Sequence, residues 1–224
     1  YSFTPSTTAY VSYGTAFRAP NINDLYYPGF FGSFAGNPDL TAETSKSFEM
    51  GLKSRLGRMH SLEASLFRTK VDDMITFTGP ANQAENSDNV TLKGLELSYQ
   101  GNARSLNWGL GATIQRAEDS NGEALVRRPN NKFTANLGYK LSENTRLGID
   151  AVFSSSRIDN DFSTTPSVRT KLGSYDLINL SASHKLSRRV NIGLRVENLT
   201  DEDYELAHGF NTPGRSAYLT LSYK

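Results

Sequence analysis

Side chains that could perform catalysis are few in this chain. It has three histidines, His60, His184 and His208, and no cysteine, which excludes a thiolate nucleophile, a disulfide framework and a thiolate metal site. Ser183 precedes His184 directly, but adjacent strand residues point to opposite faces, so the two do not form a nucleophile–base pair. No glycine-rich phosphate loop stands out. We therefore expect no catalytic residue and a protein that is not an enzyme.

Two acidic segments have some of the residue types of a calcium loop. They are residues 118–123 (EDSNGE) and 159–161 (DND), and such loops place several oxygen ligands around a turn glycine. Neither segment has the spacing of a complete binding loop, so a solvated acidic loop is the better interpretation. We expect no metal ligand and no cofactor in this chain.

Charge and hydropathy narrow the class of protein. The 224 residues carry 24 Lys plus Arg against 23 Asp plus Glu, and a net charge of +1 gives no reason to expect nucleic acid as a partner. Mean hydropathy is −0.48. No apolar run approaches the roughly 20 residues of a membrane helix. A membrane barrel can share this low hydropathy, because the residues that face its lumen dilute the apolar count.

The elements that must carry these residues follow a period of two. Residues 190–197 alternate without a break between apolar side chains and polar or small ones, as in a strand with one apolar face. Residues 90–100 also alternate, with a change of parity near Lys93 and Gly94 that predicts a bulge or bend. We predict about ten strands, no helix and an all-β fold, the remaining strands being at 8–14, 47–53, 61–67, 106–115, 133–141, 146–154, 175–185 and 216–223.

The connections between these strands alternate between short and long. The short turns are 54–58, 101–105, 141–144 and 186–189, and the long loops are 17–44, 76–89, 117–131, 155–173 and 199–215. Alternate connections of an up-and-down antiparallel sheet lie at the same end. All short turns are therefore expected at one rim and all long loops at the other, which is typical of outer-membrane barrels. A soluble β-sandwich mixes connection lengths.

Because each strand has one apolar and one polar face, we predict an antiparallel transmembrane β-barrel. We predict that the Val190 face contacts lipid and that the Asn191 face lines the lumen. Aromatic residues near strand ends fit the two girdles at the lipid–water boundaries: Tyr13, Phe67, Tyr99, Tyr139, Phe153 and Tyr223. The alternative is a soluble β-sandwich or β-helix, whose apolar face would pack on a protein core.

Several segments carry a family resemblance. Residues 12–27 (SYGTAFRAPNINDLYY), 37–53, 66–75, 93–99 and 196–215 resemble the carboxy-terminal half of TonB-dependent outer-membrane receptors. The most specific part is the asparagine–leucine element that is followed by DEDYE and TPGR, and the FRAP segment is the next. Within the family, residues 156–181 and the HGFNTPGR spacing are most similar to the cobalamin receptors.

The resemblance implies a 22-stranded barrel that is plugged by an amino-terminal domain bearing the TonB box. Residues 1–224 would then form the carboxy-terminal part of the barrel domain, about ten of its strands, and lack the plug and the first barrel strands. Any calcium site of such a receptor would belong to the missing half. Family members usually end on an aromatic residue, which would occupy the outward position one past Lys224.

The implied function is energised uptake of a large nutrient across the outer membrane of a Gram-negative bacterium. The nutrient is cobalamin or, as an alternative, a ferric siderophore. The further partners are outer-membrane lipid and, through the plug, the TonB protein. The long loops would lie outside the cell and bind the nutrient with aromatic faces and directed donors. The candidate ligand-binding residues are Tyr26, Tyr27, Phe30, Phe31, Arg127, Phe162 and Phe210.

Other readings of the same residues remain. The aromatic side chains could pack the loops against one another, and the arginines could pair with nearby carboxylates. A stand-alone barrel of about ten strands could act as an outer-membrane protease or lipase, although it would need a catalytic cluster at the rim. A passive porin or adhesin-like barrel is the last alternative.

Overall fold

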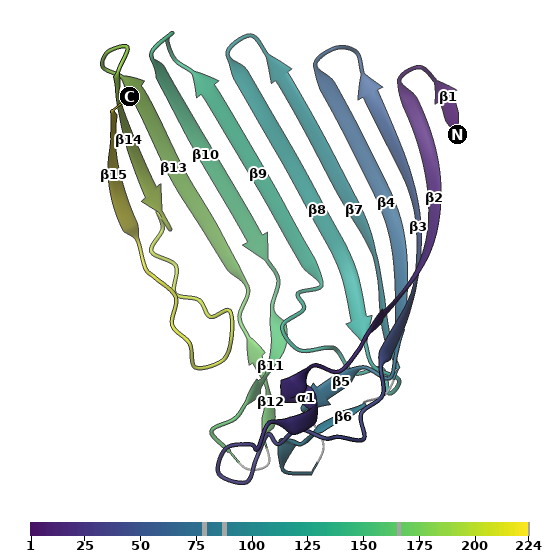
Figure 1. Cartoon of the computed structure of the whole chain (residues 1–224). Coiled ribbons are helices and arrows are strands. Elements are labelled where there is room, and N and C mark those ends of the chain that lie inside the picture. The colour runs from purple at the N-terminus through teal and green to yellow at the C-terminus, as the bar shows by residue number, and fades with distance from the viewer. Residues whose placement is uncertain (78–79, 87–88, 165–166, 224) are drawn as a thin grey trace.

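The computed structural model describes residues 1–77, 80–86, 89–164 and 167–223. Its main element is an antiparallel sheet of eleven strands in the order β1-β2-β3-β4-β7-β8-β9-β10-β13-β14-β15 (Figure 1). Each strand thus pairs with its neighbour along the chain, apart from small hairpins inserted between them. The all-β prediction and the predicted strands are confirmed.

One short strand, β1 (Ser2–Thr4), lies at the edge of the sheet beside β2. The ten long strands are β2 (Thr7–Arg18), β3 (Glu43–Leu56), β4 (His60–Asp72), β7 (Val90–Ala103), β8 (Leu106–Glu118), β9 (Asn131–Lys140), β10 (Thr145–Ser154), β13 (Tyr175–Lys185), β14 (Val190–Glu197) and β15 (Ser216–Tyr223). A terminal aromatic residue was expected one position past Lys224, and Lys224 itself lies outside the described residues.

The loops contain structure that the alternation did not predict. Two small hairpins are β5 (Ile75–Phe77) with β6 (Ala84–Asn86) and β11 (Arg157–Asp161) with β12 (Val168–Leu172). A five-residue helix, α1 (Ile22–Tyr26), and a 3-10 turn, η1 (Pro80–Asn82), are the helical elements of the described residues. No helix within the described ranges has the length and apolar character to cross a membrane.

The predicted sorting of the connections is confirmed. The tight turns all lie at one end of the strands, at the top of Figure 1, and the long connections with α1 and both small hairpins lie at the other. We call this second group of segments the loop layer. It consists of residues 19–42, 73–77, 80–86, 119–130, 155–164, 167–174 and 198–215.

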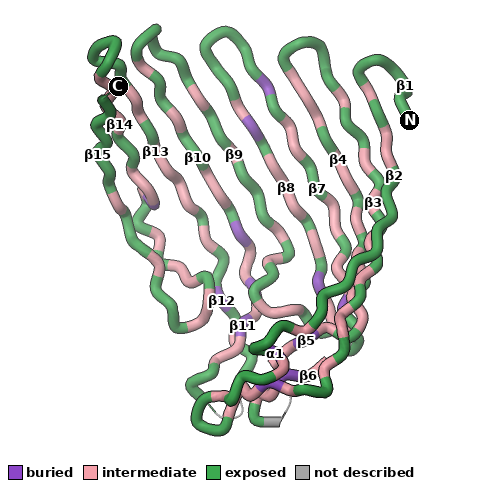
Figure 2. The backbone as a smooth tube through the Cα atoms, viewed as in Figure 1, coloured by how far each residue is buried: buried purple, intermediate pink, exposed green. Residues whose placement is uncertain are grey.

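The apolar face of the sheet is continuous across the strands. Leu194 lies opposite Ala182 and Leu219, and Ala182 lies opposite Leu147. Leu194 is 48% exposed and Leu219 is 73% exposed. Buried residues instead gather mostly in the loop layer and at the strand ends beside it (Figure 2). Among the described residues no second sheet or helix layer covers the apolar face, so the soluble-sandwich alternative is wrong.

Two details of the sequence prediction are wrong. The pairing of β4 with β7 runs without a shift from His60 opposite Gly101 to Val71 opposite Val90, so Gly94 marks no bulge. The parity changes because the environment changes along β7. Near the loop layer Val90 is 1% exposed on the polar-face side, where loops cover it.

Phe67 does not belong to the lipid-facing girdle. It pairs with Gly94 on the polar face. A Cβ atom at Gly94 would lie 2.7 Å from the Phe67 Cζ and 2.6 Å from the Ile114 carbonyl oxygen. The glycine therefore leaves room for the aromatic ring, a packing that helps to hold strand register.

Candidate functional site

The first long loop is fixed at the end of β2 by Arg18, the arginine of the FRAP segment. Its Nε and Nη2 atoms donate to the two carboxylate oxygens of Glu43 at 2.7 and 3.0 Å, and Nη1 donates to Asp24 at 3.1 Å. Asp24 also accepts from the backbone N–H of Asn21 at 3.0 Å, while the Asn21 side chain accepts from the Asp24 N–H at 2.9 Å. This capping box starts α1. The FRAP arginine is thus engaged in holding the loop.

The same loop rests on the β5–β6 hairpin. The backbone N–H of Phe34 donates to the Ala81 carbonyl at 3.0 Å, and the N–H of Ala84 donates to the Ala35 carbonyl at 2.9 Å. Ala84 is 1% exposed. Because these bonds join backbone groups, the loop keeps a defined position over the ends of β4 and β7.

Four of the predicted ligand-binding residues lie on this loop. Phe31 is 93% exposed, Tyr26 is 65% exposed, Phe30 is 64% exposed and Tyr27 is 41% exposed. The rings of Phe30 and Phe31 contact each other edge to face, with centroids 4.4 Å apart. The loop is therefore ordered by its backbone and carboxylates, and its aromatic side chains remain accessible.

Phe162 and Phe210 lie on two other loops. The Phe162 ring, 50% exposed, contacts the Phe34 ring with centroids 5.8 Å apart, so it joins the β11–β12 hairpin to the first loop. Phe210 is 71% exposed in the loop between β14 and β15. For Phe162 the packing interpretation is thus partly correct, whereas the Phe210 ring is open to solvent.

Asp159, in β11, fastens three loops together. Its side chain is 1% exposed and accepts from the Arg127 Nε at 2.9 Å, from the His208 backbone N–H at 2.7 Å and from the Asn160 backbone N–H at 2.9 Å. A buried carboxylate is tolerated when it is paired and hydrogen-bonded in this way. Arg127 precedes β9 and His208 precedes β15, so one carboxylate links the loops on either side of its own hairpin.

The hydrogen bonds of Asp159 govern its protonation. Burial alone would raise the pKa of this carboxyl. The backbone N–H groups of His208 and Asn160 and the guanidinium of Arg127 outweigh burial, and the pKa lies below that of an ordinary aspartate. The carboxylate is therefore charged at neutral pH and keeps its bonds to the neighbouring loops.

Arg157, which no sequence pattern indicated, links the β11–β12 hairpin to the loop between β14 and β15. Arg157 is 6% exposed; its Nη2 donates to the Glu205 carbonyl, and its guanidinium lies 5.2 Å from the ring centroid of Tyr175. The Tyr175 ring in turn contacts the Tyr204 ring at 4.6 Å. Isolated arginines are common in sequences, and no local pattern distinguishes this buried one.

Among the described residues no group of three or more His, Asp or Glu side chains is placed to hold a metal ion. Asp119 of the first acidic segment accepts from the backbone N–H groups of Asn121 and Glu123 at 2.9 and 2.8 Å. The Nδ1 of His184 lies 2.8 Å from the Thr145 hydroxyl on the neighbouring strand.

Comparison with known proteins decides the family. A family model described as "TonB dependent receptor-like, beta-barrel" matches residues 1–199. The chain belongs to the TonB-dependent receptor-like β-barrel family. The family and the fold imply the bacterial outer membrane, and the named relatives are transporters and receptors.

Relatives of this TonB-dependent receptor chain include the "Vitamin B12 transporter BtuB" of Vibrio vulnificus strain YJ016. It is 31% identical over 95% of this chain and 34% of its own length. A protein of the same name from Vibrio cholerae is 27% identical over 100% of this chain and 36% of its own length. The chain thus spans about a third of the length of these curated relatives.

Solved structures share the fold of this receptor chain. The siderophore receptor PirA from Acinetobacter baumannii matches with a TM-score of 0.81 and 18% identity, over 99% of this chain and 39% of its own. The ferripyoverdine receptor of Pseudomonas aeruginosa matches with a TM-score of 0.80 and 17% identity, over 100% and 32%. At these identities the likeness concerns the fold alone.

The segment that most strongly signalled the receptor family closes the last long loop. Asn198 is 4% exposed, with a left-handed backbone (φ 50°). Its side chain donates to the Glu202 carbonyl at 2.9 Å and accepts from the Glu202 N–H at 2.8 Å. Asp201 accepts from the Arg215 N–H at 2.7 Å, and a Cβ atom at Gly214 would lie 2.8 Å from the Asp201 carboxylate. The residues of the family motif therefore hold the two ends of this loop together.

Proposed function

We propose that this chain is the carboxy-terminal part of a receptor whose external loops bind cobalamin, and that TonB energises its uptake. The plug and the first barrel strands would come from other parts of the protein. The two curated relatives described above support cobalamin as the ligand, because both are vitamin B12 transporters. The loop layer would be the binding end, since long loops of outer-membrane barrels are extracellular.

The observation that carries the proposal is the contrast between fixed loops and free aromatic rings. Asp159 and Arg18 hold the loops through buried or paired carboxylates. Phe31 and Phe210 nevertheless remain 93% and 71% exposed. Ordered loops that present large apolar rings to water suit a bulky ligand with flat faces, because binding then needs little reordering of the loops.

The barrel wall suits passage of such a ligand. The polar face carries charges of both signs: Lys53 of β3 lies opposite Glu63 of β4, and Glu96 of β7 and Lys132 of β9 both lie opposite Thr113 of β8. A hydrated wall of mixed charge would face the plug. Displacement of the plug by TonB would open a path along it.

Titration of the full-length receptor in detergent with cyanocobalamin tests this proposal. We expect binding at micromolar concentration or tighter, and an about 5-fold weaker affinity for Phe210→Ala or Phe31→Ala, because each loses an aromatic contact of roughly 1 kcal/mol. Phe3→Ala is the matched control: Phe3 is 61% exposed but lies at the opposite end of the strands. Absence of cyanocobalamin binding at micromolar levels defeats the ligand assignment.

A ferric siderophore is the second candidate ligand. Arg127 and Arg128 are both exposed in the loop layer, and guanidinium groups bind anionic ligands well. The same titration with a ferric catecholate separates the two ligands. Binding of the catecholate without cyanocobalamin, weakened by Arg128→Gln, would establish the siderophore instead.

A further inference from the structure

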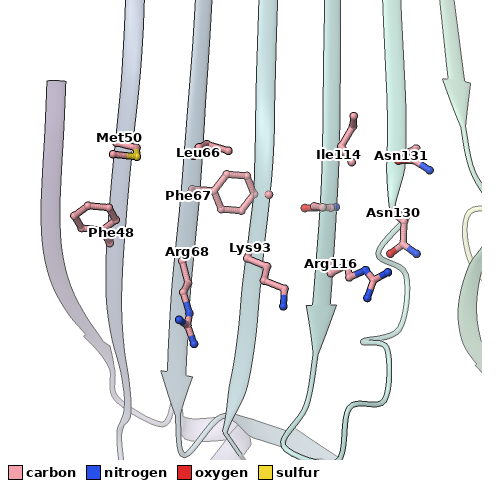
Figure 3. Close-up of a pocket in the computed structure, with 12 residues that line it drawn as sticks. Phe48, Met50, Leu66, Phe67, Arg68, Lys93, Ile114, Arg116, Asn130 and Asn131 are labelled. Carbon is pink, nitrogen blue, oxygen red and sulfur yellow. The ribbon is translucent and has the colours of Figure 1, made fainter. Parts of the chain in front are cut away.

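Three basic side chains form a row on the lipid-facing side of the sheet, next to the loop layer. Arg68 of β4 lies directly opposite Lys93 of β7, and Lys93 lies directly opposite Arg116 of β8. The row continues the register of the apolar face, since Leu66 and Ile114 precede Arg68 and Arg116 by two residues. We call Arg68, Lys93 and Arg116 the basic row (Figure 3).

The positive charge of the basic row is poorly compensated. Within the described ranges Arg68 and Lys93 form no ion pair, and the Arg116 Nη1 lies 4.0 Å from the Glu118 carboxylate with its side chain 70% exposed. Like charges directly opposite each other on neighbouring strands destabilise a sheet. Two such pairs in succession carry a cost that a bound anion would remove.

An apolar groove adjoins the basic row. Met50, Leu66 and Ile114 line it at 44%, 52% and 43% exposure, and it encloses about 570 Å³ together with the row and with Asn130 and Asn131. In Figure 3 the three apolar side chains lie on the side away from the loop layer, and the basic groups lie toward it. The groove thus passes from apolar to cationic along the direction in which the bilayer meets water.

We propose that the basic row binds the phosphate group of a membrane lipid whose acyl chain lies along Met50, Leu66 and Ile114. Guanidinium forks pair well with phosphate, and an ammonium group between them adds a point charge. Free phosphate would use the cations but leave the apolar floor exposed. A lipid uses both, and the face that carries them is the one that contacts the bilayer. The inference rests on the wall of the barrel and is independent of the nutrient.

Lipid retention by the full-length receptor in detergent micelles tests the proposal. The probes are dioleoyl phosphatidic acid, dioleoylglycerol, which has the same chains without phosphate, and inorganic phosphate. Native mass spectrometry counts the bound molecules. We expect phosphatidic acid to bind and dioleoylglycerol and inorganic phosphate to bind at least 10-fold more weakly.

Charge removal from the basic row supplies the decisive variants. Arg68→Gln, Lys93→Gln and Arg116→Gln together should weaken phosphatidic acid binding roughly 100-fold, because each basic side chain near a membrane surface contributes about 5-fold. The control combines Lys53→Gln, Lys132→Gln and Arg195→Gln, which remove the same number of charges from the other face. We expect less than a 3-fold change in the control. The single variant Lys93→Gln should weaken binding about 5-fold. It keeps the proposal testable if the triple variant does not fold.

Three results overturn the proposal. Equal retention of dioleoylglycerol would show that the acyl chains alone are recognised. Equal binding of inorganic phosphate would show an anion site without lipid. Undiminished phosphatidic acid binding in both the triple variant and Lys93→Gln would show that the basic row is not the site.

Discussion

The wall of the barrel and the loop layer place their side chains by different physical means. In the wall, Leu194 is 48% exposed, and no second layer within the described residues covers its face of the sheet. In the loop layer, Asp159 is 1% exposed and depends on donors 32 and 49 residues away in the sequence. Water surrounds the loops, so specific polar bonds hold them. We expect lipid to determine which side chains face outward in the wall, whereas hydrogen bonds and ion pairs between distant residues determine the arrangement of the loop layer.

The largest expected effect concerns the wall. Leu194→Arg should destabilise the protein folded in a bilayer by about 2–4 kcal/mol if the site lies near the midplane. Arg195→Leu should cost about 1 kcal/mol or less, because it removes an exposed ion pair with Glu197 and a contact with the Tyr218 ring. Refolding of the full-length receptor variants into lipid vesicles measures both. Equal costs would contradict the assignment of the faces.

A smaller effect is expected in the loop layer. Asp159→Ala leaves the donors from Arg127, His208 and Asn160 without their acceptor, which should ease local opening by about 2 kcal/mol. Hydrogen exchange at the His208 amide should then accelerate about 30-fold. Asp203→Ala is the control, since Asp203 is exposed in the same loop as His208. The fastening role would be refuted by similar exchange rates in the two variants.

The smallest effect is a response of the loop layer to acid. The pKa of Asp159 is lowered in the folded state, so its contribution to stability is present above the ordinary aspartate pKa of about 3.9 and is lost as pH falls through the lower folded pKa. Exchange at the His208 amide, corrected for its intrinsic pH dependence, should therefore accelerate below about pH 4. Asp159→Asn should remove this response while leaving the wall unchanged. A wild-type profile that stays flat to pH 2 would disprove the linkage.

Arginines show the same contrast between the two regions. Arg18, Arg127 and Arg157 in or beside the loop layer each meet a carboxylate or a backbone carbonyl. Arg68 and Arg116 on the wall lie beside another cation. Arginines with a partner inside the protein hold its loops in place, whereas the adjacent cations of the basic row are the basis for the proposed phosphate site.

Much of the wall could be predicted because the alternation of apolar and polar residues is visible within a single strand. Residues 190–197 alone show which face is apolar, and the lengths of the connections show which end carries the loops. The rule failed where the environment changed along one strand. Val90 and Phe67 both face the polar side, Val90 under the loops and Phe67 over Gly94, and a constant period of two does not reveal either packing.

The candidate site was predictable only as a set of residues. Composition and resemblance selected Tyr26, Phe31, Arg127 and Phe210, but not the partner of Arg127 or the roles of Asp159 and Arg157. These depend on contacts between loops that are distant in sequence. The ligand-binding role of the seven predicted residues stays a prediction.

The sequence by itself determined the strands, their two faces and the sorting of short turns from long loops, because each follows from a period of two and from the lengths between periodic segments. Tertiary structure alone decided which side chains meet across strands and loops. Register placed Arg68, Lys93 and Arg116 in one row, and folding of the loops enclosed Asp159, since both need residues 23 to 49 positions apart to approach each other.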